Sequence, residues 1–209
     1  MSEHLSKNKY EHGLGKNAAN FTPLTPLSFI ERTARVFPDH TAIIYREIQR
    51  SWAETYQRCV KLAAALHNNG IRKGDTVAMM LPNVPAALEA HFGVPMCGAV
   101  LNALNIRLDA KTIAFILDHG EAEILLTDKE FSNTIKEALT LCKSNPLVID
   151  VDDALAPEGE MLGEIEYEAF LTEGKASYEW YYPENEWDAI SLNYTSGTTG
   201  NPKGVVYHH

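Results

Sequence analysis

The sequence TVAMMLPNVPAALEAHFGVPMCGAVLNA, Thr76 to Ala103, carries the strongest signal of the fold class. Residues Thr76 to Leu81 form an apolar run typical of a buried strand, and Pro85 to Met96 has the length of a helix that begins with proline. Ala99 to Ala103 reads as a second short strand. Strand, helix and strand at this spacing indicate parallel strands joined by a crossover helix. The sequence therefore predicts an α/β fold, a mostly parallel sheet with helices on both faces.

The same alternation extends in both directions from this unit. On the C-terminal side we expect a helix capped by Asp109 and closed at Gly120, a strand at Glu123–Thr127, a helix at Phe131–Lys143 and a strand at Leu147–Val151. On the N-terminal side we expect a helix with Thr25 as its N-cap and Pro26 at its first position, paired extended segments at 41–45 and 47–52, and a helix opened by the capping box Ser51–Glu54 and ended by Gly70.

Two segments do not follow this alternation of strands and helices. Residues 1–24 form a polar lead, and residues 152–186 are acidic, so we expect there a surface excursion with one short helix near Glu164–Leu171. Order resumes with an apolar strand at Ala189–Tyr194, a loop at 194–204 and a strand at Gly204–Tyr207. We expect one partial domain over residues 25–209.

Composition excludes several classes of function. The formal net charge of −10 and the absence of a dense lysine and arginine cluster argue against a nucleic-acid binder. No apolar run approaches the roughly 20 residues of a transmembrane helix, and the start is not a signal peptide, so the cytoplasm is the expected location. Three distant cysteines and eight histidines without an HExxH pattern indicate no zinc site.

The loop YTSGTTGNPKG, Tyr194 to Gly204, concentrates hydroxyls and glycines ahead of a lysine. Glycines leave backbone N–H groups free to converge on an anion, hydroxyls donate hydrogen bonds, and lysine adds a compact positive charge. This composition predicts a phosphate-binding loop. It is not a Walker A loop, because Lys203 follows Pro202 and precedes Gly204 rather than a serine or threonine.

The string LNYTSGTTGNPK, Leu192 to Lys203, resembles the AMP-binding signature of the adenylate-forming superfamily, which includes acyl-CoA synthetases, adenylation domains of peptide synthetases and firefly-type luciferases. Further landmarks resemble that family in the family's order: FPD at 37–39, WAETY at 52–56, GDTVA at 74–78, LPN at 81–83 and LNALNIRL at 101–108. The resemblance implies an acid-thiol ligase with ATP, Mg²⁺ and coenzyme A as cofactors. A carboxylate would attack ATP to give acyl-AMP and pyrophosphate, and a thiol would then take the acyl group.

The resemblance also implies roles for particular residues. The β- and γ-phosphates would be held by Thr195, Ser196, Gly197, Thr198, Thr199, Gly200 and Lys203. Thr195 would also reach Mg²⁺, and His209 would lie near the acyl carboxylate. The family's catalytic lysine and its adenine and ribose contacts fall downstream of the signature. We therefore expect an N-terminal fragment of a fatty-acyl-CoA ligase that is inactive alone.

Two other functions stay open at this point. One is an adenylation domain that loads a carrier protein, and the other is a non-catalytic nucleotide-binding remnant. A P-loop phosphotransferase is disfavoured, because valines rather than a GK[ST] helix start follow the loop. The expected substrate is a small carboxylate, such as a fatty acid of short to medium chain length. Whether the full-length form is a homodimer is also left open.

Overall fold

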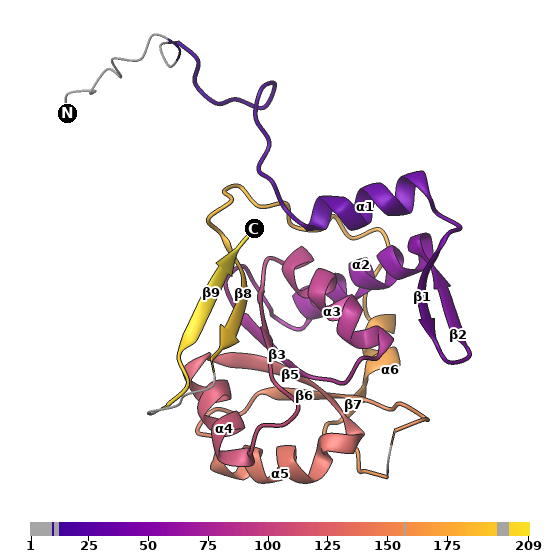
Figure 1. The fold of residues 1–209 in the computed structure, drawn as a ribbon, viewed down its shortest axis with the longest axis vertical. Helices are drawn as coiled ribbons and strands as arrows, with labels where there is room; N and C mark the ends of the chain where they lie inside the picture. The colour runs from indigo at the N-terminus through magenta and orange to yellow at the C-terminus, as the bar shows by residue number, and fades with distance from the viewer. Residues whose placement is uncertain (1–9, 11–12, 157, 196–200) are drawn as a thin grey trace, which may run out of the picture.

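The structure is a computed structural model that describes residues 10, 13–156, 158–195 and 201–209. Its main element is a seven-stranded sheet in the order β7-β6-β5-β3-β4-β8-β9, parallel except for the β8–β9 pair (Figure 1). The strands are β3 (Thr76–Met80), β4 (Val100–Ala103), β5 (Ala122–Asp128), β6 (Leu147–Val151), β7 (Ile165–Glu166), β8 (Ala189–Tyr194) and β9 (Gly204–His208). A separate antiparallel hairpin joins β1 (Thr41–Tyr45) and β2 (Ile48–Ser51).

Helices cover both faces of the sheet, as predicted. They are α1 (Leu27–Val36), α2 (Trp52–Asn68), α3 (Pro85–Met96), α4 (Ala110–His119), α5 (Ser132–Leu141) and α6 (Tyr167–Thr172), with a 3₁₀ turn at Lys129–Phe131. Alternate residues of β3 enter two different cores: Val77 and Met79 pack with α2, α3 and α6, whereas Ala78 and Met80 pack with α4 and α5. Both faces of β3 are therefore buried, which explains its unbroken apolar sequence.

Local signals in the sequence place the helix ends. Ser51 and Glu54 form the reciprocal capping box of α2, and Asp109 caps α4 by accepting from Thr112 N. Gly70 has a φ of +94°, the left-handed geometry expected where α2 ends. The first helix differs slightly from the prediction, since it begins at Leu27, after Pro26, and the Thr25 hydroxyl accepts a hydrogen bond from Leu27 N.

The acidic segment 152–186 is more deeply buried than its composition indicates. It adds β7, which was not predicted, to one edge of the sheet and places α6 against α2. Tyr167 and Phe170 of α6 are fully buried, whereas Glu168 beside them is exposed. The expected surface excursion is thus corrected for this part, because two aromatic side chains contribute to the core even though glutamates stand on both sides of them in the sequence.

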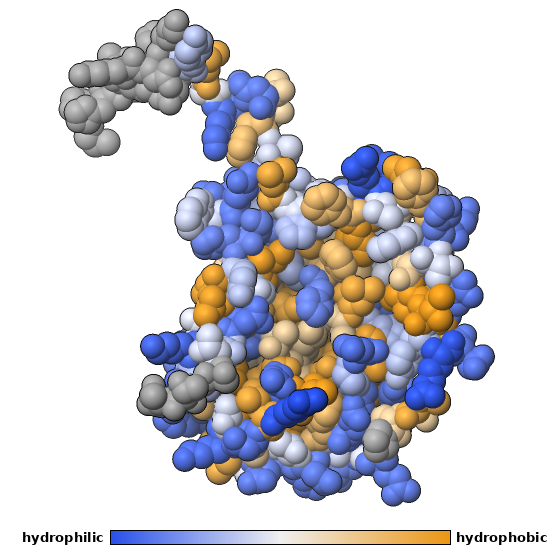
Figure 2. Space-filling view, viewed as in Figure 1, coloured by the Kyte–Doolittle hydropathy of each residue, from blue (hydrophilic) through white to orange (hydrophobic). Residues whose placement is uncertain are grey.

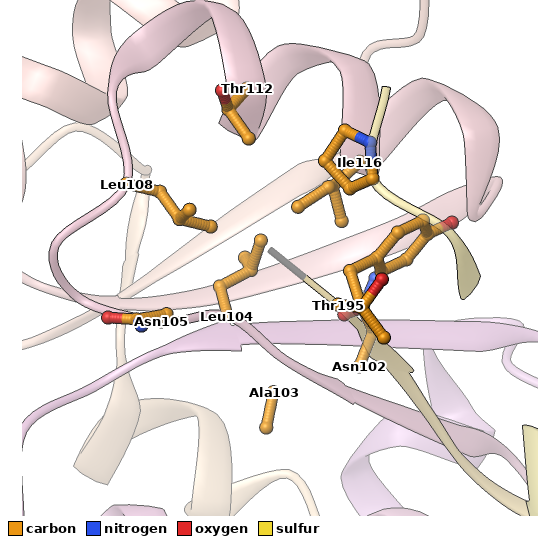
Figure 3. A pocket seen from close by; sticks show the side chains of 10 residues that line it. Asn102, Ala103, Leu104, Asn105, Leu108, Thr112, Ile116 and Thr195 are labelled. Atoms are coloured by element: carbon orange, nitrogen blue, oxygen red, sulfur yellow. The ribbon is translucent and has the colours of Figure 1, made fainter. Parts of the chain in front are cut away.

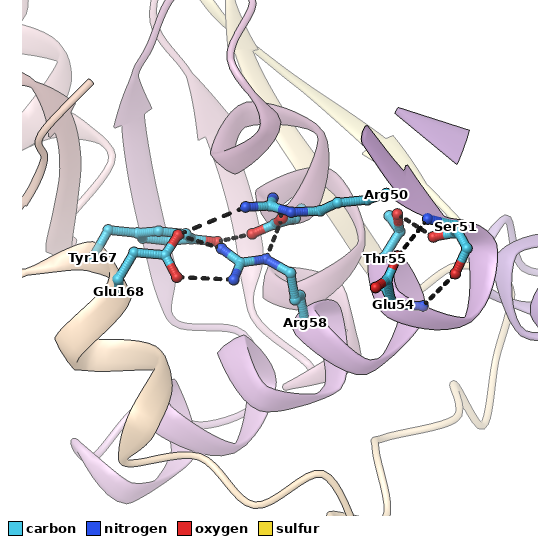
Figure 4. Close-up of polar contacts among 8 residues, drawn as sticks. Arg50, Ser51, Glu54, Thr55, Arg58, Tyr167 and Glu168 are labelled. Carbon is cyan, nitrogen blue, oxygen red and sulfur yellow. Dashed lines mark hydrogen bonds and ion pairs between the residues drawn. The ribbon is translucent and has the colours of Figure 1, made fainter. Parts of the chain in front are cut away.

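A buried polar cluster joins four of these elements (Figure 4). Glu89 of α3, with a fully buried side chain, accepts hydrogen bonds from Arg50 of β2, Arg58 of α2 and Tyr167 of α6. Arg58 also donates through both Nη atoms to Glu168. The cluster therefore fixes how the hairpin, two helices and α6 pack together.

The molecular surface is mixed in character. Figure 2 shows apolar residues over the centre of the face drawn and hydrophilic residues along its lower edge, where Figure 1 places α5. Large apolar side chains that are more than half exposed include Leu24, Phe29, Ile44 and Trp187. Among the described residues, no helix has the length and apolar character needed to span a bilayer.

Candidate functional site

The base of the 194–204 loop is a closed hairpin end at the carboxyl edge of the sheet. Tyr194 of β8 pairs with Gly204 of β9, and Thr195 N then donates to Lys203 O at 3.0 Å. β8 lies beside β4, so the loop begins close to the segment that leaves β4. The two ends of the loop are thus held together by backbone hydrogen bonds. Ser196, Gly197, Thr198, Thr199 and Gly200, which were predicted to bind phosphate, lie outside the described residues.

Tyr194 anchors this base to the neighbouring helix α4. Its hydroxyl lies 2.7 Å from Nδ1 of His119, and the two rings meet edge to face with centroids 5.7 Å apart. His119 in turn stacks on Phe115, one turn earlier in α4. Burial raises the pKa of Tyr194, so the phenol stays protonated at neutral pH and can share its proton with the imidazole. Sequence reasoning placed Tyr194 in the loop but gave it no partner.

A cavity of about 320 Å³ lies between the loop base and the segment after β4 (Figure 3). It is lined by Asn102, Ala103, Leu104, Asn105, Leu108, Thr112, Ile116, Tyr194, Thr195 and Pro202. The lining combines amide and hydroxyl groups with aliphatic walls and contains no charged side chain. Asn102, Asn105 and Thr112 were not predicted as site residues. An asparagine inside the apolar run VLNA was the one available signal.

Two of the predicted phosphate ligands are described, and both are available for a ligand. Lys203 is exposed and makes no ion pair with any residue that the structure describes. The Thr195 hydroxyl is exposed and hydrogen-bonds to no described residue. An exposed ammonium group and an exposed hydroxyl at the two ends of this loop can together neutralise and orient a polyphosphate.

His209, predicted to lie near the acyl carboxylate, occupies a different part of the molecule. Its Nδ1 lies 2.8 Å from the Thr25 hydroxyl, and its backbone N donates to Asp188 O. Because β9 runs away from the loop, His209 lies roughly 17 Å along the chain from Gly204 at about 3.3 Å per residue. The structure therefore does not bring His209 together with Thr195 and Lys203. Burial lowers the pKa of His209, so its imidazole is neutral at pH 7.

Metal ligands are sparse in the part of the chain that the structure describes. No group of three or more histidine, cysteine, aspartate or glutamate side chains there could hold a metal ion. Mg²⁺ prefers oxygen ligands and keeps several waters or phosphate oxygens when it binds with a nucleotide. The free Thr195 hydroxyl fits a single ligand of that kind.

Comparison with known proteins matches most of the chain to one family. The model of the AMP-binding enzyme family matches residues 30–209. The acetate/butyrate–CoA ligase AAE7 of Arabidopsis thaliana, named as peroxisomal, is 47% identical over 208 residues, covering 94% of this chain and 37% of that protein. The peroxisomal trans-cinnamate:CoA ligase of Petunia hybrida is 44% identical, with 94% of this chain and 37% of that protein covered. The chain thus spans little more than a third of the length of these relatives.

The fold is also found in solved structures. The anthranilate CoA ligase AuaEII, solved in complex with anthranoyl-AMP, superposes with a TM-score of 0.82 at 22% identity over 93% of this chain and 36% of that one. This match supports the predicted architecture of a mostly parallel sheet flanked by helices.

The relatives correct one expectation. Both plant ligases are named as peroxisomal, which contradicts the cytoplasmic location expected from the sequence. The expectation rested on the lack of a signal peptide and of an apolar span. Peroxisomal addresses are short sequences read by receptors, so neither composition nor hydropathy reveals them.

Proposed function

The chain belongs to the AMP-binding enzyme family, and from that premise we propose that it provides the phosphate-binding part of an ATP-dependent acyl-CoA ligase. The observation that carries this proposal is the base of the loop at 194–204. A backbone hydrogen bond from Thr195 to Lys203 closes it, and Lys203 is exposed and pairs with no acidic side chain that the structure describes. The names of the relatives, all of which act on a carboxylate and CoA, support the same reaction.

The proposed reaction has two steps. A carboxylate oxygen attacks the α-phosphorus of ATP, the bond to the β-phosphate oxygen breaks, and acyl-AMP and pyrophosphate form. The sulfur of CoA, as thiolate, then attacks the acyl carbon, and AMP leaves with the electron pair of the broken C–O bond. Because the first step brings two anions together, its rate depends on neutralising phosphate charge and on holding an in-line geometry.

The residues of the loop have separate tasks in this proposal. Lys203 would balance the charge that builds up on the departing pyrophosphate, and the hydroxyls of Thr195, Ser196, Thr198 and Thr199 would donate to phosphate oxygens. Gly197 and Gly200 would leave backbone N–H groups accessible. When bound, Mg²⁺ would supply Lewis-acid neutralisation of the phosphates, with the Thr195 hydroxyl as a ligand. His209 stays proposed as a substrate neighbour.

The substrate class is a small carboxylate. The relatives include ligases named for acetate, butyrate and trans-cinnamate, so the acyl group in this family ranges from short aliphatic to aromatic. We propose a short- or medium-chain acid for this protein, as expected from the loop and its flanks. We also propose a peroxisomal location, which the names of both plant relatives support.

The 209 residues alone are proposed to bind nucleotide without turnover. They align with 37% of the length of these relatives, and the family's catalytic lysine is not among the motifs in this stretch. Carboxylate-dependent pyrophosphate exchange by the isolated chain would contradict this proposal.

The decisive experiment is ATP–pyrophosphate exchange by the whole protein, with acetate, butyrate, hexanoate and trans-cinnamate supplied separately. We expect exchange that requires both ATP and a carboxylate, followed by thioester formation when CoA is added. Exchange without thioester formation would instead favour loading of a carrier protein. ATP binding without any exchange would favour a non-catalytic remnant.

A further inference from the structure

A second cavity, of about 410 Å³, lies at the carboxyl edge of the sheet, on the face that α3 and α6 cover. Its lining comes from the hairpin β1–β2, from the start of α3 and from the segments that follow β6 and β7. None of these residues lines the cavity beside the loop base. Figure 1 places the hairpin and α6 on the side of the molecule opposite β8 and β9.

The connections that leave the strands diverge next to this cavity. β3 continues into α3 on one face of the sheet, whereas its neighbour β5 continues into α5 on the other face. In open α/β sheets, ligands bind in the crevice that such divergent connections leave at the carboxyl ends of the strands. Val84 and Pro85, which follow β3, and Val151, at the end of β6, line the cavity. The cavity therefore occupies a position that suits a ligand.

The charges around the cavity favour a cation. Among its described lining residues are five carboxylates and only two basic side chains, Arg50 and Arg58. Both arginines already pair with Glu89 and Glu168, so neither is available to an anion. Glu47, which is exposed, makes no ion pair with any residue that the structure describes. The five carboxylates belong to Glu47, Asp152, Asp153, Glu166 and Glu168.

A buried carboxylate beside the cavity adds to this negative charge. Asp128 ends β5 with no exposed surface, and its Oδ2 has no hydrogen-bond partner among the described residues. Asp128 stands opposite Val151 of the cavity lining in the parallel ladder. Their side chains lie on the same face, because Leu126 and Ile149, two residues earlier in each strand, share one core. A buried carboxylate oxygen without a partner needs an explanation, and a cation in the adjacent cavity would provide one.

The groups at the site restrict the kind of cation. No cluster of histidine, cysteine, aspartate and glutamate in the described part of the chain could hold a metal ion. Asp128 Oδ1 already accepts from Glu130 N, so this carboxylate offers one oxygen, which suits an ammonium group better than a bidentate guanidinium. The apolar part of the lining suits an aliphatic chain and consists of Ile48, Val84, Pro85, Ala86, Val151 and Leu155.

We propose that this cavity binds a small organic cation, a primary ammonium group on a short aliphatic chain. The chain packs on the apolar lining, and the ammonium group is attracted by Glu47, Asp153 and the buried Asp128. A volume of about 410 Å³ lies within the roughly 300–1,000 Å³ of small-molecule sites. The site goes beyond the proposed ligase reaction and does not depend on it, because none of its lining residues belongs to the loop at 194–204.

Calorimetric titration of the whole protein with hexylamine, which is protonated at pH 7, tests this site. We expect saturable binding below millimolar concentration. Hexan-1-ol has the same chain without the charge and should bind roughly tenfold more weakly. A lower affinity for the amine than for the alcohol, or an equal one, would overturn the proposal.

Variants of the carboxylates locate the binding. Asp128→Asn keeps the shape of the side chain and removes its charge, so the affinity for hexylamine should fall roughly tenfold. Glu47→Gln, at an exposed position, should weaken binding roughly two- to fivefold. Glu137→Gln is the matched control, because it removes one negative charge from an exposed position on α5, on the other face of the sheet, and should leave the affinity unchanged.

Affinity separates a ligand role of Asp128 from a structural one. A purely structural role would let Asp128→Asn change the Tm while its affinity for hexylamine stayed the same. Should that variant not fold, Glu47→Gln must still weaken binding relative to Glu137→Gln. The proposal is overturned if hexylamine does not bind at millimolar concentration, or if neither Asp128→Asn nor Glu47→Gln binds it more weakly than Glu137→Gln. Because the measurement is of binding, failure of ATP–pyrophosphate exchange would count against the proposed function and not against this site.

Discussion

Arg58 Nε donates to Glu89 Oε1 at 2.6 Å, although the two residues lie on different helices and the Glu89 side chain is fully buried. Burial alone would lower the pKa of Arg58, but its hydrogen bonds to Glu168 and Glu89 outweigh burial and raise that pKa. Arg58 therefore keeps its positive charge, and its hydrogen bond to Glu89 is a fixed polar contact between α2 and α3.

Removing the charge of Glu89 should destabilise the fold strongly. Glu89→Gln leaves two arginines, each less than a fifth exposed, with only the exposed Glu168 as an acidic partner, and breaking such a buried pair costs about 3 kcal/mol. Denaturant unfolding measures the loss. Glu31→Gln is the control, because Glu31 pairs with Arg35 at the surface and should change stability by less than about 0.5 kcal/mol. Equal effects of the two variants would contradict the structural role of Glu89.

Lys203→Ala should weaken ATP binding to this chain about tenfold, because one ammonium group in contact with phosphate is lost. Isothermal titration in low salt provides the measurement. Lys175→Ala removes the same charge from an exposed position near the end of α6 and should leave the affinity unchanged. If both variants lose affinity equally, the effect is one of net charge and the loop is not the phosphate site.

The contact between Tyr194 and His119 should stabilise the loop base. Tyr194→Phe and His119→Ala each remove the 2.7 Å hydrogen bond, so the double variant should lose less stability than the sum of the two single variants, by about 0.5–1.5 kcal/mol. Hydrogen exchange of the Thr195 amide, which closes the loop, should quicken in all three. Additive effects on stability would show that the two side chains act independently.

Asp128 should make stability depend on pH. Its side chain is fully buried at the end of β5, Oδ1 accepts from Glu130 N, and Oδ2 has no partner among the described residues. Burial raises its pKa to about 6, so folding favours the protonated acid. Its contribution is therefore most favourable below about pH 4 and is lost as the pH rises to about 6.

The stability of the variant Asp128→Asn, measured against that of the unsubstituted chain, isolates the contribution of the Asp128 carboxyl group. The variant should match the unsubstituted chain near pH 4 and exceed it by on the order of 1–3 kcal/mol at pH 7. The pKa values of Asp118 and Asp188 are shifted downward, so protonation of these two groups destabilises the fold only at more acidic pH. That effect is the same in the variant and in the unsubstituted chain. A constant difference between pH 4 and pH 7 would contradict the titration of Asp128.

Gly174→Ala should prevent α6 from packing closely on α2. A Cβ at this position would overlap the backbone oxygen of Lys61, and a backbone atom cannot rotate away. We expect a loss of roughly 2 kcal/mol or more, measured as a lower Tm. Gly15→Ala is the matched control, since a Cβ there would meet no atom within 4 Å.

Most helices and strands of this protein could be predicted from short stretches of sequence. The alternation from Thr76 to Val151, the capping box at Ser51, the cap at Asp109 and the glycine at 70 all place helix and strand ends where the structure has them. These signals are local, because a cap or a hydrophobic period is complete within a few residues. The hydroxyls, glycines and lysine from Thr195 to Lys203, on which the phosphate-binding prediction rests, are likewise visible in the sequence alone.

Contacts between distant residues, by contrast, could not be predicted without the three-dimensional fold. The strand order, the burial of Tyr167, the meeting of Glu89 with Arg58, and the placement of Asn102 beside Thr195 join segments separated by dozens of residues. His209 lies beside Thr25 and away from the loop, because β9 runs antiparallel to β8 and returns the chain to the other end of that strand. Such contacts arise from packing of whole elements, and no spacing within one element encodes them.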